Sequence, residues 1–475
     1  MKTAKEEQLQ KKLSPMNVWA LAFGCIIGAS AFVLPGTTFL FKGGVLGMII
    51  GIAIAALIMI VIAFNYNYMI NEYPIAGGEF TYTQKAFGPN SAYWCSWFLG
   101  LSYVCIVPIN ATALAVIGRN LLGSVFQFGF HYVVAGYDVY LGEVLLAIIA
   151  LLLFAYLSVR GVKFAGVFQT FLAFSLVGSV LIVASVALLK GSFNIHHLQP
   201  VFYPGVSGVS SILAILAISS YAFVGFDTIP QAAEEFKFSP SKSKKIMVLS
   251  ILLGGFIYVI LNTITAAIIP SNYHDWVEYI NASKKLSGLE SLPTFHAAYQ
   301  LMGGFGLLCF GVSAVAAALS GIIGFYMASS RLLFSMSREK VIPSWFGDLH
   351  SKYKTPHNAI LFVMLFSLIA PFFGRIALSW IVDMSSVGAA IGYGFTSAAA
   401  FLYAKRRGHK FIMVTGIIGA IMALIFLVLL LVPIKLFNCS LGVESYSCLI
   451  VWIILGIAFY CKTQKYSGKS IYESI

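Results

Sequence analysis

Long apolar runs alternate with short polar stretches along almost the whole chain. An apolar run of about 18 or more residues can cross the roughly 30 Å hydrocarbon core of a bilayer as a helix. The pattern therefore predicts an all-α polytopic membrane protein with twelve spans. Their approximate limits are 16–41, 44–70, 92–123, 140–160, 164–189, 208–233, 244–269, 295–334, 358–374, 377–404, 411–432 and 444–461. The eighth run is too long for one membrane thickness, so part of it must tilt or project.

The composition agrees with a membrane protein. Of the 475 residues, 59% are hydrophobic and 10% are charged, against about a quarter charged in soluble proteins. The net charge of +13 is explained by the excess of Lys and Arg in cytoplasmic loops, so we expect no nucleic-acid partner. With the N-terminus inside, 23 of the 30 Lys and Arg residues lie in inner segments and 7 in outer ones. This bias predicts a multi-pass protein of the cell membrane with two cytoplasmic tails, 1–15 and 462–475.

Two of the predicted spans contain residues that interrupt helices. The first carries "FGCIIGASAFVLPG", with Gly28 followed by Pro35, and the sixth carries "YAFVGFDTIP", with Gly225 followed by Pro230. Five spans separate the two features, and an odd offset places the second copy upside down relative to the first. Gly and Pro also serve close packing in membrane helices, but two interrupted spans at matching positions favour a transporter site near the midplane.

The interruptions have a definite chemistry. A helix opened near Gly28 frees N–H groups at the positive end of a helix dipole, where a carboxylate is favoured. The carbonyls freed by both interruptions form a negative pocket that suits an ammonium group. The pattern therefore predicts a receptor for a zwitterion, with exposed backbone as its ligand.

Two carboxyl groups fall close to membrane depth, Asp227 and Asp383. Intramembrane acids are functional candidates by default. Asp227 has two interpretations: it carries or senses a proton during transport, or it accepts hydrogen bonds from backbone N–H groups of the interrupted sixth span. Asp383 is the weaker candidate, because it lies nearer an end of its span.

Charged residues also occur in the predicted inner loops. Glu72, Glu79 and Lys85 flank the Gly-Gly of "NEYPIAGGEFTYTQKAFGP", and Arg331 and Arg338 lie in "RLLFSMSREKVIP". We interpret both segments as solvated loops, with ion pairing between loops as the alternative.

Other function classes find little support in the motifs. The seven cysteines show no zinc-binding spacing, and we predict no metal, no cofactor and no enzyme activity. Cys439 and Cys448 flank one loop and form a disulfide if that loop faces an oxidising side. A channel needs a continuous polar lining, which the spans lack. A non-transporting receptor remains an alternative.

Five segments resemble, in order, motifs of the amino acid–polyamine–organocation superfamily of permeases. They are "GCIIGASAFVLPG", "PIAGGEFTYTQKAFG", "RGVKFAG", "YAFVGFDTIPQAAEEFKFSP" and "SSRLLFSMSREKVIP". The resemblance implies the leucine-transporter-like fold, in which two inverted five-helix repeats work by alternating access. It assigns 16–190 to the first repeat, 208–404 to the second, and 411–461 to two added helices.

The resemblance also implies roles for residues of both interruptions. The expected substrate-binding residues are Ile26, Ile27, Gly28, Ala29, Ser30, Tyr221, Phe223, Val224 and Gly225. The backbone N–H groups of 28–30 would hold the substrate carboxylate, while carbonyls at 26–27, 221 and 224 would hold the ammonium. Phe223 would cover the substrate as an aromatic gate. Asp227 lies where related exchangers carry an acid tied to proton dependence.

The chain departs from the superfamily pattern at two positions. Ser30 stands where a Gly is usual, and Leu176 stands where many members carry a Lys. The second departure argues against a Lys-based proton mechanism and leaves a sodium site near Ser320, or exchange without a coupled ion. The expected function is a symporter or exchanger of neutral amino acids, with H⁺ or Na⁺ as the candidate coupling ion. An amine or acidic amino acid exchanger of the same fold is the alternative. The sequence does not indicate the oligomeric state.

Overall fold

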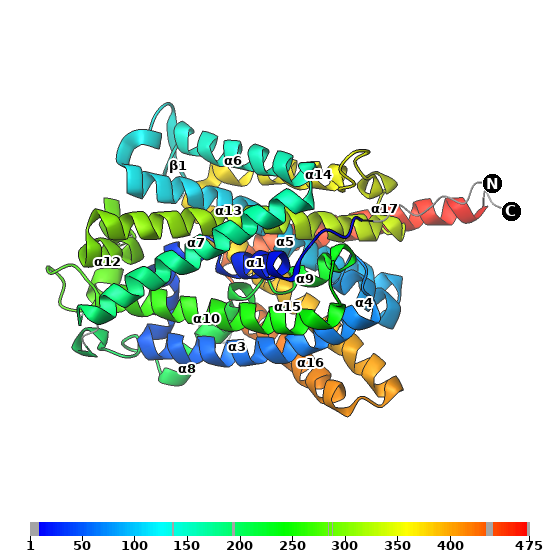
Figure 1. The fold of residues 1–475 in the computed structure, drawn as a ribbon, viewed down its shortest axis with the longest axis horizontal. Coiled ribbons are helices and arrows are strands. Elements are labelled where there is room, and N and C mark those ends of the chain that lie inside the picture. The colour runs from blue at the N-terminus through cyan, green and yellow to red at the C-terminus, as the bar shows by residue number, and fades with distance from the viewer. Residues whose placement is uncertain are drawn as a thin grey trace.

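The computed structural model describes residues 9–134, 137–191, 195–283, 285–286, 288–433 and 440–472. They form a bundle of long helices, most of which lie side by side along the longest axis of the molecule (Figure 1). Among these residues, ten helical segments are long and apolar enough to cross a membrane, and two shorter apolar helices cover 208–222 and 357–373. The protein is therefore a multi-pass helical membrane protein.

The helices are α1 Pro15–Ile27, α2 Ser30–Val33, α3 Phe41–Glu72, α4 Glu79–Phe87, α5 Pro89–Leu122, α6 Leu141–Arg160, α7 Val162–Leu189, α8 Gly208–Ala222, α9 Thr228–Gln231, α10 Ser243–Ala267, α11 Trp276–Ser283, α12 Pro293–Met302, α13 Gly304–Arg338, α14 His357–Ser367, α15 Gly374–Arg407, α16 Lys410–Leu431 and α17 Val443–Tyr472. An antiparallel hairpin, β1 His131–Val134 and β2 Tyr137–Tyr140, pairs His131 with Tyr140.

Each predicted span coincides with helical structure. The long eighth run divides at Gly303, whose φ of 60° ends α12 and lets α13 start in a new direction. This division accounts for its excess length. The sixth predicted span is interrupted, because α8 ends at Ala222 and α9 begins only at Thr228. Cys439 lies outside the described residues, so the disulfide with Cys448 stays a prediction.

Helix α1 lies at the centre of the bundle, packed against α7, α10 and α13 (Figure 1). All its residues from Val18 to Ile27 are buried. Two glycines allow the close approach of α1 and α13 that small residues permit in membrane bundles. A Cβ added at Gly24 would lie 1.8 Å from Ser320 Oγ, and one added at Gly324 would lie 2.0 Å from Cys25 Sγ.

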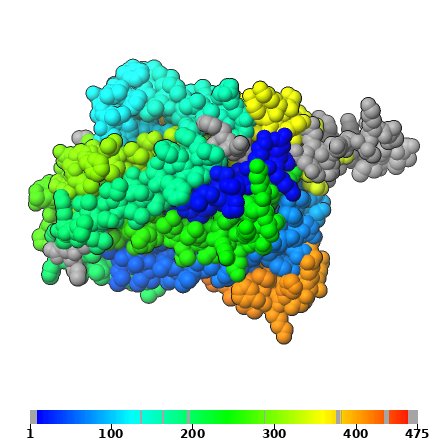
Figure 2. All heavy atoms as spheres, viewed as in Figure 1, coloured from blue at the N-terminus to red at the C-terminus, as the bar shows by residue number. Residues whose placement is uncertain are grey.

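The N-terminal segment, residues 9–14, covers one end of the bundle. We call this end, which includes the chain after α9 and the ends of α3 and α13, the N-terminal face. Figure 2 shows this segment lying across the surface between α7 and α10. Its backbone pairs with the chain that follows α9: Lys12 and Leu13 N–H donate to the Glu235 carbonyl at 2.9 and 3.0 Å, and Lys237 N–H donates to the Leu13 carbonyl at 2.9 Å. The closure is therefore made largely by backbone hydrogen bonds.

Ion pairs strengthen the same face. Arg331 Nε lies 2.9 Å from Glu235 Oε1, and both side chains are almost completely buried. Arg338 pairs with Glu234 at 2.9 Å, and Arg407 pairs with Glu72 at 2.6 Å. The interpretation of Arg331, Arg338 and Glu72 as residues of solvated loops was therefore wrong. The physical reason is that Arg331 and Arg338 belong to α13 and Glu72 ends α3, so their side chains stay at the end of the bundle, where charges need partners.

The buried pair generates a stability prediction. Arg331→Met leaves the Glu235 carboxylate buried without a cation, and we expect the free energy of unfolding to fall by about 3–5 kcal/mol. The double variant Glu235→Leu with Arg331→Met should lose less than the sum of the single losses. Thermal unfolding in detergent measures both. Glu339→Gln, which alters an exposed hydrogen bond with Gln84, is the control and should change the free energy of unfolding little. A loss as large as that of Arg331→Met would contradict the prediction.

Candidate functional site

The first interruption lies between α1 and α2. Gly28 has φ of 46°, a conformation that residues with a Cβ rarely adopt. The last α1 hydrogen bond runs from Gly28 N–H to the Gly24 carbonyl at 3.2 Å. The next N–H, of Ala29, turns away from the helix axis and donates to Asn110 Oδ1 of α5 at 3.0 Å. The opened backbone is thus held by a side chain from a neighbouring helix.

The second interruption lies between α8 and α9. Gly225 has φ of 146° and donates its N–H to Asp227 Oδ1 at 2.6 Å. Its carbonyl accepts the Thr228 hydroxyl at 2.6 Å. Asp227 therefore does accept a hydrogen bond from the backbone of the interruption, as one of its two interpretations predicted.

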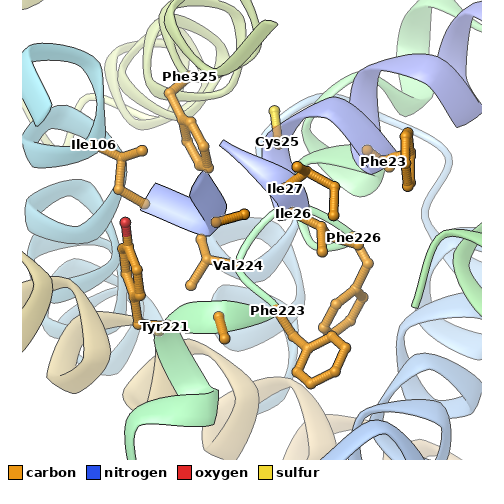
Figure 3. Close-up of a cluster of buried hydrophobic side chains, with 14 of the residues drawn as sticks. Phe23, Cys25, Ile26, Ile27, Ile106, Tyr221, Phe223, Val224, Phe226 and Phe325 are labelled. Atoms are coloured by element: carbon orange, nitrogen blue, oxygen red, sulfur yellow. The ribbon is translucent and has the colours of Figure 1, made fainter. Parts of the chain in front are cut away.

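The two interruptions touch each other. A Cβ added at Gly225 would lie 2.5 Å from the Ile26 nitrogen and 2.8 Å from Cys25 Cβ. Because Gly225 has no side chain, the opened part of the sixth predicted span rests directly on the backbone of α1. Figure 3 shows Phe226 of this stretch beside Ile26.

A small cavity lies between the interruptions. Its lining comes from both of them and from α5 and α10: Cys25, Ile26, Gly28, Ser30, Ile106, Asn110, Tyr221, Val224 and Tyr258. Two tyrosine hydroxyls form hydrogen bonds with residues of the first interruption, one with a backbone carbonyl and one with a side chain. Tyr258 donates to the Ile26 carbonyl at 3.1 Å, and Tyr221 donates to Ser30 Oγ at 3.0 Å. None of these lining residues is charged.

The structure brings together five of the residues expected to bind a substrate, because Ile26, Gly28, Ser30, Tyr221 and Val224 all line this cavity. The other four do not line it. They are Ile27, Ala29, Phe223 and Gly225.

The ring of Phe223 is directed away from Tyr221 and Val224 (Figure 3). It lies against α10, where a Cβ added at Gly255 would be 3.5 Å from the ring. Its role as a gate stays a prediction.

Four lining residues were missed by the sequence interpretation: Cys25, Ile106, Asn110 and Tyr258. Asn110 carried a usable signal, since it is a lone amide in the apolar run "VCIVPINATALAVIG", and polar groups in such runs face the bundle interior. Its Nδ2 donates to the Ile106 carbonyl one turn earlier at 2.9 Å, which leaves Oδ1 for Ala29. Tyr258 had no such signal, because aromatic residues are frequent in the spans.

The two coupling candidates lie outside the cavity. Ser320 is buried behind α1, where Gln169 Nε2 of α7 donates to its hydroxyl and, at 3.1 Å, to its carbonyl. Asp227 is fully buried and also accepts a hydrogen bond from the Tyr103 hydroxyl at 3.0 Å. Asp383, the other acid near membrane depth, accepts from Ser445 at 2.8 Å and takes no part in the site.

Comparison with known proteins identifies the family to which this chain belongs. The model of the amino acid permease family matches residues 13–459. A branched-chain amino acid permease of Bacillus subtilis (strain 168) is 24% identical over 475 aligned residues, which cover 96% of this chain and 94% of that protein. A methylthioribose transporter of the same organism is 24% identical, with 98% and 96% covered. The mitochondrial cationic amino acid transporter 3 of Arabidopsis thaliana is 24% identical, with 82% of this chain and 61% of that protein covered. The chain belongs to the amino acid permease family of the amino acid–polyamine–organocation superfamily, a family of membrane transporters and not of enzymes.

Proposed function

We propose that the protein is a secondary active transporter that moves a neutral amino acid across the cell membrane by alternating access. The observation that carries this proposal is the uncharged cavity enclosed by the opened backbone of two interrupted spans. Interrupted helices at membrane depth are stable only where they are buried in protein or line a cavity. Backbone N–H groups on one side and carbonyls on the other suit the two charges of a zwitterion.

Two side-chain contacts support the proposed positions of the substrate charges. Asn110 Oδ1 accepts the Ala29 N–H, the kind of group proposed to hold the carboxylate. The Tyr258 hydroxyl donates to the Ile26 carbonyl, the kind of group proposed to hold the ammonium. A bound zwitterion replaces each of these neutral hydrogen bonds with a charge-assisted one, which is roughly twice as strong. Binding therefore costs no unsatisfied backbone group.

The remaining lining favours a small neutral side chain. Ile106 and Val224 supply apolar surface, in keeping with the branched-chain amino acid permease among the relatives. A cationic substrate, such as the name of the Arabidopsis relative indicates for that protein, would need a carboxylate in the cavity. The carboxyl of Asp227 is already engaged by Gly225 and Tyr103. An acidic substrate would need a cation among the lining residues, and the described ones supply none.

The family architecture completes the proposal. The ten long apolar helices and the two shorter ones make twelve spans, in which 16–190 and 208–404 form inverted repeats and 411–461 adds the last two. The excess of Lys and Arg on one side makes the N-terminal face cytoplasmic, with both termini on that side. For coupling we favour a proton at Asp227 over sodium near Ser320, because Gln169 already donates to both oxygens of Ser320.

The proposed function predicts saturable, stereoselective uptake of radiolabelled L-leucine into proteoliposomes, with L-alanine and L-methionine as further probes and D-leucine as a poor competitor. Ser30→Phe fills the cavity between Tyr221 and the opened backbone, so uptake should fall at least tenfold and stabilisation by ligand in thermal unfolding should vanish. Ser241→Phe, in an exposed loop, is the matched control. Unsaturable flux would indicate a channel, binding without flux would indicate a receptor, and full activity of the Ser30 variant would refute the site.

A second variant tests where the carboxylate binds. Asn110→Asp places a carboxylate beside the Ala29 N–H, and repulsion between like charges should weaken L-leucine binding tenfold or more. The matching amine, isopentylamine, lacks a carboxylate. It should bind the Asn110→Asp variant no more weakly than it binds the parent protein. Asn120→Asp lies on the same helix near its end and is the control. Ligand-induced thermal stabilisation measures the binding of L-leucine and of isopentylamine to the parent protein and to both variants. An equal loss of binding for the amino acid and the amine in the Asn110 variant would contradict the assignment.

A further inference from the structure

Two acids are buried together at the edge of the site. Glu79, the first residue of α4, and Asp227, in the second interruption, both have 0% exposed surface. Neither forms an ion pair with a Lys, Arg or His of the described residues. The interpretation of Glu79 as part of a solvated loop was therefore wrong. The Gly77–Gly78 turn folds the start of α4 inward, where a Cβ on Gly78 would lie 2.8 Å from Gln231 Nε2.

A tyrosine hydroxyl stands between the two acids. The Tyr103 hydroxyl lies 3.0 Å from Asp227 Oδ2 and 3.4 Å from Glu79 Oε1. Glu79 also accepts the Tyr66 hydroxyl at 2.8 Å and Gln231 Nε2 at 2.6 Å. Since a hydroxyl has one proton, Tyr103 can donate to only one of its neighbours at a time. The second acid must then either accept from another group or carry a proton itself and donate it to the Tyr103 oxygen.

Among the described residues, no cation lies beside the pair that would allow both acids to ionise. The titratable groups that interact electrostatically with one or both acids include Tyr82 of α4, Tyr66 of α3, Cys95 of α5, Tyr393 of α15 and Cys25 of α1. All of them are neutral at physiological pH. Further along the chain, Arg331 is paired with Glu235.

Two carboxylates that share one hydroxyl in a dry interior disfavour double ionisation. Burial raises the pKa of the Glu79 carboxyl, and the negative charge of Asp227 raises it further. The pair is therefore built to hold at least one proton.

We propose that Glu79 and Asp227 form a proton-binding pair, linked by Tyr103, and that this pair carries the proton which drives uptake. This inference rests on the proposed transporter function. The transfer is balanced: the O–H bond of the Glu79 carboxyl breaks as an O–H bond forms on Tyr103, and the original Tyr103 O–H bond breaks as one forms on Asp227 Oδ2. One proton moves from Glu79 to Asp227, and Tyr103 ends as a neutral hydroxyl.

Each end of the pair contacts a part of the transporter that must move. On one side, Asp227 Oδ1 holds the Gly225 N–H, and Gly225 rests on the Ile26 backbone that borders the cavity. A protonated carboxyl accepts this bond more weakly, so the charge of Asp227 sets how firmly the second interruption is held.

On the other side, Ala76 N–H donates to Glu234 Oε2 at 3.2 Å, and the same oxygen pairs with Arg338 at 2.9 Å. The turn that leads into Glu79 thus belongs to the closed N-terminal face. When that face opens, Glu79 is the acid of the pair that meets water, so it exchanges the proton there.

The test uses the full-length protein in proteoliposomes with an imposed pH gradient. Radiolabelled L-leucine reports uptake, and a trapped pH-sensitive dye reports proton movement. The parent protein should accumulate leucine when the proton gradient is directed inward and should move protons only with leucine. Glu79→Gln should lose gradient-driven accumulation and proton movement at least tenfold. It should keep leucine exchange without a gradient and keep stabilisation by leucine in thermal unfolding, because it does not touch the cavity.

Two further variants make the outcome decisive. Tyr103→Phe keeps both acids but removes the link, and should slow proton movement in the same way even if Glu79→Gln fails to fold. Glu72→Gln, at the end of α3, is the matched control and should keep gradient-driven accumulation. Full accumulation by Glu79→Gln and Tyr103→Phe, or gradient-independent uptake by the parent protein, would overturn the proton pair while leaving the transporter intact. Absence of leucine, alanine and methionine uptake by the parent protein would instead overturn the proposed function.

Discussion

Every backbone N–H and carbonyl in the interior of a bilayer must have a hydrogen-bond partner, and the site of this protein is organised around that constraint. Opening a helix at Gly28 and another at Gly225 releases such groups where water is scarce. Side chains supply these partners. Asn110 accepts from the Ala29 N–H, Tyr258 donates to the Ile26 carbonyl, and Asp227 accepts from the Gly225 N–H. These contacts explain why helices as distant in sequence as α5 and α10 surround the interruptions.

The same constraint links the cavity to the N-terminal face. Asp227 is needed as an acceptor for the second interruption, yet a carboxylate there has no cation beside it among the described residues. Tyr103 and Glu79 complete its surroundings, and Glu79 is held in turn by Tyr66 and Gln231. The need for a hydrogen-bond acceptor at the second interruption thus places Asp227 in the dry interior, next to Tyr103 and Glu79. The proposed proton transfer uses these same residues.

The extent to which the sequence predicted this structure depended on the kind of signal. The hydropathy pattern predicted a multi-pass helical protein, and the positions of Gly28 and Gly225 identified both interruptions, because these features are local. The partners of the opened backbone were not predictable in the same way. Asn110 and Tyr258 reach the site through packing between helices, and neither has a spacing that reveals its contact. Glu79 and Arg331 were misjudged because charged residues in the first or last turns of helices, here α4 and α13, look in sequence like charged residues of solvated loops.

The pairing of Lys12 and Leu13 with Glu235, and of Lys237 with Leu13, is made by main-chain atoms. These bonds do not depend on the side chains of the same residues, of which Leu13 is buried in the core and Glu235 pairs with Arg331. Substitutions that preserve those side-chain contacts would therefore leave the main-chain bonds in place. The residue types at these positions alone do not reveal that the segment before α1 is joined to the segment after α9.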